Sequence, residues 1–236
     1  MQLQQGYHSA SGPSFHPEFT CPSREVQIEE APCLTTMGDP VKNKTTRRRN
    51  LEILAVLATA GGHLACHVLP IPRLLFVSVV VIGWVLYGAT RGGLSNPNFA
   101  AAWRPLALFG GVSIAIMAAI GLFMGTFSLH WHLFAALLLY PLWGVVQQYL
   151  VQELIAGNLD ESGWGLPAIT LATAALFGLI HLPFAVLMVA TFVLGLVFTP
   201  HYLRYRNVLV LGLWHGWLGT LLYFWVLGRD PLSGLG

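Results

Sequence analysis

The chain has 236 residues, of which 55% are hydrophobic and only 9% charged, with a mean hydropathy of +0.64 and a formal net charge of +2. A soluble domain carries roughly a quarter charged residues. The composition therefore excludes an ordinary soluble globular protein and predicts an integral membrane protein.

The first 50 residues differ in composition from the rest of the chain. They are rich in Ser, Pro, Glu and Thr and show no periodic apolar pattern, so they cannot bury enough apolar surface to become ordered. We expect residues 1–50 to form a flexible tail. The first long apolar stretch begins only at Leu51, which argues against a secretory signal peptide and predicts a transmembrane domain over residues 51–236.

Apolar runs of about the length that crosses a bilayer as a helix follow one another through this domain. They lie at 51–69, 74–90, 106–128, 133–156, 167–182, 183–202 and 207–227. The pattern predicts an all-α, polytopic transmembrane helix bundle of about seven helices, with limits of six and eight. Pro183 leaves open whether its region forms two helices or one kinked helix.

The basic residues predict the orientation, because cytoplasmic flanks retain Lys and Arg. With the tail in the cytoplasm, ten of the twelve basic residues fall on that side, and only Arg73 and Arg229 fall outside. The Arg47–Arg49 run before Leu51 is the strongest determinant, and we interpret it as a topology anchor rather than a nucleic-acid or lipid-headgroup site. We predict a multi-pass protein with a cytoplasmic tail.

Four polar side chains interrupt the apolar run at 133–156: Gln147, Gln148, Gln152 and Glu153. Polar groups at membrane depth are costly and persist mainly where they face one another or a wet cavity. On a regular helix Gln148 and Gln152 share a face, whereas Glu153 lies about 140° from Gln148. The glutamines fit either interhelical hydrogen bonding or a functional site, and a π-bulge would re-aim Glu153.

Two histidines occur in later apolar runs. Phe177 and His181 lie one helical turn apart, and His215 stands close to Gly216 and Gly219. Either histidine alone is typical of a packed, hydrogen-bonded residue. Two imidazoles on separate helices beside a glutamine-bearing helix predict a shared polar site.

The order of these motifs resembles the CAAX-processing and bacteriocin-processing intramembrane endopeptidases, the CPBP or Abi proteases, over about residues 133–224. That family has a Glu-Glu-x-x-x-Arg helix, then Phe-x-x-x-His, a glycine-bearing helix and a His-x-x-x-Asn type motif. Phe177 to His181 matches the second motif, and the approach from Arg206 to His215 is similar to the last.

This sequence departs from the family where the chemistry would occur. Gln147 and Gln148 stand at the positions of the glutamate pair, Gln152 stands at that of the arginine, and Gly219 replaces the asparagine. An amide has no accessible basic pKa, and general-base assistance is typically worth about 10² to 10⁴ in rate. The replacements predict a remodelled and weakened centre.

The resemblance implies roles for individual residues. Gln147 or Gln148 would stand in for the base, His181 would activate water, and His215 would stabilise the oxyanion. The supporting residues would be Gln152, Glu153, Phe177 and Gly219.

The resemblance also implies what the protein does and where it acts. We expect an endopeptidase in the bacterial inner membrane that cuts a membrane-associated peptide, either prenylated or a leader peptide. A catalytically inactive relative that binds or escorts such a peptide is the alternative. A transporter ranks lower, because paired interrupted helices are missing from the sequence.

The remaining signals indicate packing rather than a cofactor. His63 and His67 have a metal-site spacing but no nearby carboxylate, and His130, Trp131 and His132 are typical of interfacial anchors. The three cysteines are an odd number, which argues against a disulfide framework or a structural zinc site. We therefore expect the bilayer and a peptide as partners, no nucleic acid, no metal and no cofactor, and leave the oligomeric state open.

Overall fold

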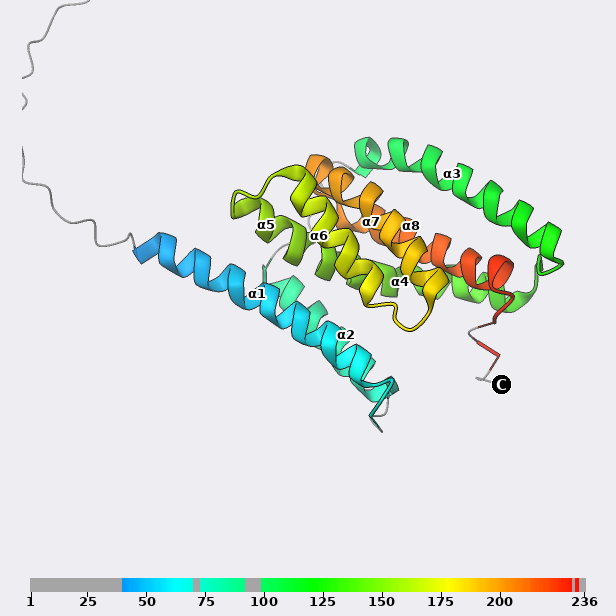
Figure 1. The fold of residues 1–236 in the computed structure, drawn as a ribbon, viewed down its shortest axis with the longest axis horizontal. Helices are drawn as coiled ribbons and strands as arrows, with labels where there is room; N and C mark the ends of the chain where they lie inside the picture. The colour runs from blue at the N-terminus through cyan, green and yellow to red at the C-terminus, as the bar shows by residue number, and fades with distance from the viewer. Residues whose placement is uncertain (1–39, 70–72, 92–98, 231, 234–236) are drawn as a thin grey trace, which may run out of the picture. The chain divides into compact units, whose positions relative to one another are not determined.

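The computed structural model describes residues 40–69, 73–91, 99–230, 232 and 233. Within them the chain forms seven continuous helices (Figure 1). They are α1 (Pro40–Ala65), α2 (Arg73–Arg91), α3 (Phe99–Met124), α4 (Trp131–Gln148) continued by the π-helix η1 (Tyr149–Gly157) and α5 (Asn158–Glu161), α6 (Leu166–Leu179), α7 (Ala185–Tyr205), and α8 (Val208–Leu221) continued by the π-helix η2 (Leu222–Val226). The all-α prediction is confirmed.

The predicted bundle of about seven helices is confirmed by the seven helices of the described residues. Four of the described helices are long and apolar enough to cross a membrane: α3, α4 with its continuation, α7, and α8 with η2. Helix α6 has only 14 residues, which is about 21 Å against a hydrocarbon core of about 30 Å. A helix of that length starting at one face ends roughly 10 Å short of the other. The chain is nevertheless an integral membrane protein, as predicted.

The region around Pro183 forms two helices. Helix α6 ends at Leu179, the chain turns, and α7 begins at Ala185. His181 lies in this turn, so it is not held inside a regular helix. The two-helix alternative is the correct one.

Helix α1 begins earlier than the sequence indicated. It starts at Pro40, inside the segment predicted as a flexible tail, and the rest of that segment lies outside the described residues. Glu52 helps to attach α1 to the neighbouring helices. Its side chain is almost fully buried and lies 3.3 Å from both Arg48 and Arg91. Asn158 also donates a hydrogen bond to Glu52 at 2.8 Å. These contacts join the first half of α1 to α2 and α5.

Glycines bring α4 and α8 into direct backbone contact. A Cβ added to Gly144 would lie 2.3 Å from the carbonyl oxygen of Gly212, and one added to Gly216 would lie 2.4 Å from the Cα of Pro141. Real side chains essentially never approach so closely. The sequence therefore specifies an intimate α4–α8 pair, and this pair positions the glutamines against the last histidine.

Candidate functional site

A cavity of about 500 Å³ lies among α3, α4, α7, α8 and the turn after α6. Gln147 contributes from α4, His181 from the turn, and His215 and Gly219 from α8. Apolar side chains form most of the wall, and none of the described residues that line the cavity is acidic or permanently basic. The structure thus brings four of the predicted site residues to one neutral cavity.

Gln148 forms a hydrogen bond with the imidazole of His215. Its amide nitrogen lies 3.2 Å from Nδ1 of His215, and both side chains are buried. Because an amide N–H donates, Nδ1 accepts, and the ring proton of the neutral imidazole then resides on Nε2. His215 therefore offers the cavity an N–H donor.

His181 has the opposite tautomer. Its Nδ1 lies 2.8 Å from the carbonyl oxygen of Phe177, and a carbonyl can only accept, so Nδ1 carries the proton. In the neutral ring Nε2 then holds the lone pair. His181 is an acceptor or base toward the cavity, while His215 is a donor.

The ring of Phe177 separates and orients the two histidines. It is fully buried, and it meets His181 edge-on at 5.4 Å between ring centroids and His215 edge-on at 5.1 Å. Edge-to-face contacts at these separations are favourable and directional. The supporting role of Phe177 stays a prediction.

Gln147 and Gln152 have different surroundings. Gln147 lines the cavity together with His181. Gln152 is fully buried, and neither of its amide atoms has a hydrogen-bond partner within the described part of the chain. Gln152 therefore makes no hydrogen bond to His181 or His215 within the described residues.

Glu153 is re-aimed by a π-helix, but away from the cavity. The π-helix η1 begins at Tyr149, directly after Gln148. The carboxylate of Glu153 lies 3.5 Å from Arg91 and accepts a hydrogen bond from the hydroxyl of Tyr202. Arg91 and Tyr202 therefore hold the Glu153 side chain, and Glu153 is not among the described residues that line the cavity.

Gly219 leaves room beside His215. A Cβ built at this position would meet only Cδ2 of His215, at 4.0 Å. A larger side chain there would face the histidine rather than clash with a backbone. The place where the related family often has asparagine is physically open.

His63, Tyr140 and Tyr223 were not predicted to belong to the site, yet all three line the cavity. His63 comes from α1, outside the region of family resemblance. The available signal for His63 was its position as a polar residue inside an apolar run. Local spacing does not show which helices pack against it. The tyrosines carried no signal of their own.

Comparison with known proteins identifies part of the chain. Residues 129–221 match the family model described as Rce1-like, type II CAAX prenyl endopeptidase Rce1-like. The predicted resemblance is thereby confirmed over the segment that holds Gln147, His181 and His215. Neither the curated proteins nor the solved structures contain a match to the chain.

Proposed function

Taking the Rce1-like match of residues 129–221 as the premise, we propose that this protein is an intramembrane endopeptidase. Its site is the cavity lined by Gln147, His181 and His215. The opposite tautomers of the two histidines carry the proposal, because peptide hydrolysis needs one base for water and one donor for the oxyanion.

The reaction follows from these two rings. Nε2 of His181 takes a proton from a water molecule, whose oxygen attacks the scissile carbonyl carbon and forms the new C–O bond. Nε2–H of His215 donates to the developing oxyanion, and Gln147 positions the water through its amide. The C–N bond then breaks, and His181 returns its proton to the leaving amine.

Gln148 acts through His215 and is a positioning residue. Its hydrogen bond at 3.2 Å maintains the tautomer that presents Nε2–H. The arrangement lacks a carboxylate base among the described cavity residues, so proton abstraction depends on His181 alone, and we expect slower turnover than in a glutamate-based centre.

The substrate class follows from the cavity wall. Most of the wall is apolar, with Phe109, Ile116 and Leu194 among its residues. Such a cavity suits an apolar peptide segment or a prenyl chain better than a charged peptide. A prenylated, membrane-associated peptide is therefore the proposed substrate.

The predicted orientation remains part of this proposal. Arg49 donates to the backbone oxygen of Glu161 at 2.6 Å, and Arg206 pairs with Asp160. These contacts gather basic residues from α1 and the end of α7 around one loop, as the positive-inside rule expects of a cytoplasmic face. A bacterial inner membrane stays the proposed location, and labelling of single cysteines placed in this loop in intact cells tests the orientation.

One observation favours an inactive binding protein as the second candidate. The amide of Gln148 is engaged by His215, and the described residues of the cavity include no carboxylate. Such a protein would hold the same apolar peptide without cutting it.

A cleavage assay separates the two functions. The full chain, reconstituted in liposomes, is incubated with a fluorogenic farnesylated peptide, and the native protein is compared with His181→Ala and His215→Ala. We expect cleavage by the native chain and its loss in both variants, because each removes one partner of the pair. His201→Ala is the matched control, since His201 is a buried histidine on α7 that is not among the cavity-lining residues described.

Two outcomes would contradict the proposed enzyme. Unchanged cleavage in both histidine variants would show that the reaction occurs elsewhere. Saturable peptide binding without any cleavage by the native chain would favour the inactive binding protein.

A further inference from the structure

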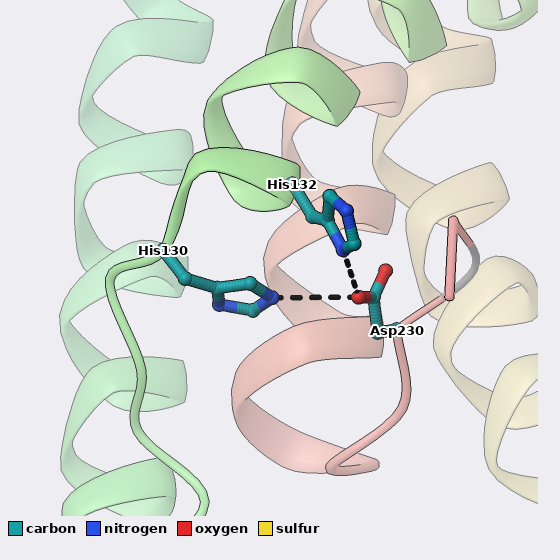
Figure 2. Close-up of side chains that lie close together, drawn as sticks. All are labelled: His130, His132 and Asp230. Carbon is teal, nitrogen blue, oxygen red and sulfur yellow. Dashed lines mark hydrogen bonds and ion pairs between the residues drawn. The ribbon is translucent and has the colours of Figure 1, made fainter. Parts of the chain in front are cut away.

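A second cluster of side chains lies at the opposite end of α4 from η1. Figure 2 shows His130 and His132, at the start of this helix, both directed at the carboxylate of Asp230. The sequence predicts membrane-interface anchoring for the two histidines, and in the structure their rings converge on one oxygen, Oδ2. None of the three residues is among those described around the large cavity.

The geometry of the cluster is that of a ligand set. One nitrogen from each histidine and one oxygen of Asp230 all lie within 4.8 Å of one another. Nε2 of His130 is 3.5 Å from Oδ2, which is longer than a normal N–H···O bond of about 2.9–3.0 Å. Ligand atoms about 2.0–2.1 Å from a tetrahedral zinc ion lie about 3.3–3.4 Å apart. The separation between His130 and Asp230 therefore fits two ligands of one ion. Nδ1 of His132 is in direct hydrogen-bond contact with Oδ2, so these two atoms move apart when both bind the ion.

The carboxylate is oriented for this task by its own loop. Oδ1 of Asp230 accepts a hydrogen bond from the backbone N–H of Leu232 at 2.8 Å, which leaves Oδ2 facing the histidines. Such outer hydrogen bonds are the usual means of orienting a metal-binding carboxylate.

The histidine rings are also supported. His130 packs against Phe224 with ring centroids 5.1 Å apart, and His132 packs against Trp131 at 3.9 Å. The nearby cation, Arg229, lies over the ring of Phe184. It is therefore directed at an aromatic ring, where it does not compete for the Asp230 carboxylate.

The side chains remain accessible. Their exposed fractions are 40% for His130, 23% for His132 and 21% for Asp230, so an ion can enter from solvent and a water molecule has access to a fourth position. Two imidazoles and one carboxylate are ligands that suit divalent transition metals such as zinc.

We propose that His130, His132 and Asp230 bind one divalent transition-metal ion of the zinc type, with water completing a tetrahedral site. The ion links the segment after η2 to the beginning of α4. Tyr223 of η2 lines the large cavity, and its carbonyl oxygen accepts a hydrogen bond from the backbone N–H of Arg229 at 2.9 Å. Metal binding therefore stabilises the end of the bundle next to the proposed catalytic cavity.

The test uses the full chain in detergent, with any affinity tag removed and metal stripped with a chelator. Zn²⁺ alone is titrated by calorimetry, and Co²⁺ alone by its visible ligand-field absorption. We expect one ion per chain, a tetrahedral Co²⁺ spectrum, and a Zn²⁺-dependent rise in melting temperature on the order of 5 °C at saturating metal. His132→Ala and Asp230→Asn should each weaken binding about 100-fold or more, because each removes one of three ligands.

A matched control addresses the other histidine pair of the chain. His63→Ala combined with His67→Ala removes two histidines four residues apart, one at the end of α1 and one in the turn that follows it, and should leave the Co²⁺ spectrum unchanged. Absence of binding by the native chain would overturn the proposal, as would loss of binding in this control. Binding that persists in His132→Ala combined with Asp230→Asn would also overturn it. If Asp230→Asn fails to fold, His130→Ala gives the same comparison.

Discussion

The sharpest prediction concerns which of the two adjacent glutamines can regain a carboxylate. Gln147 lines the cavity with His181, whereas the amide of Gln148 is fully buried and lies 3.2 Å from Nδ1 of His215. Gln147→Glu would place a carboxylate beside the attacking water, where a general base is typically worth about 10² to 10⁴ in rate. Because His181 already serves as a base, we expect kcat/KM to rise by only part of that factor.

Gln148→Glu should have the opposite effect, although the two residues are neighbours in the sequence. A carboxylate at this position accepts a hydrogen bond, so Nδ1 of His215 must donate and Nε2 becomes a lone pair. Loss of an oxyanion donor typically costs about 10² to 10³ in kcat. Removing a carboxylate from water also costs several kcal/mol, so the melting temperature should fall.

The measurement is kcat/KM on the farnesylated peptide for both variants, reconstituted side by side. Each variant is checked for a single symmetric peak in gel filtration. Activation by Gln148→Glu without activation by Gln147→Glu would refute the tautomer assignment of His215. A rise in neither variant would refute the assignment of Gln147 to the water-binding position.

Two further predictions concern glycines on α8. Gly212→Ala would put a Cβ 2.4 Å from the Cα of Val145, so overpacking should cost about 1–3 kcal/mol of stability and lower the activity. Denaturation in detergent measures the loss of stability. Gly111→Ala is the control, because its Cβ meets open space and should have no comparable effect. Gly219→Asn should raise kcat about tenfold, because the new amide faces His215 and supplies a second oxyanion donor; a lower kcat with unchanged stability would contradict the assignment of this position.

Local spacing was sufficient to predict one pair of neighbouring side chains at the cavity. Phe177 and His181 lie one turn apart in the sequence, and the structure uses that same interval for the ring contact and for the Nδ1 hydrogen bond to the carbonyl. Both contacts join residues four apart in the chain, so they depend on the local backbone at the end of α6. For this reason the pairing did not require knowledge of the neighbouring helices.

The different roles of Gln147 and Gln148 could not be predicted in the same way. They depend on the register between α4 and α8, which is fixed by backbone contacts at Gly144 and Gly212. The placement of His63 likewise depends on how α1 packs against the rest of the bundle. These are long-range packing relations, and a periodic pattern within one helix does not encode them.

The buried charged residues near Glu153 pair with one another and do not line the cavity. Arg91 lies between two acids, 3.3 Å from Glu52 and 3.5 Å from Glu153. The described residues that line the cavity carry no charge when their histidines are neutral. Buried charges at membrane depth are expensive unless they are paired. Gathering them into one network leaves the cavity neutral before the reaction.

A neutral resting site has a consequence for the proposed reaction. When His181 accepts the proton of water, its ring becomes a cation at the same moment as the substrate carbonyl becomes an oxyanion. The two charges therefore arise together, and their attraction is stronger in a low-dielectric cavity than in water. The electrostatic stabilisation then acts on the transition state and not on the ground state, which is the condition for lowering the barrier. A histidine pair with opposite tautomers can in this way do part of the work that a permanent carboxylate would do, without burying a charge in the resting protein.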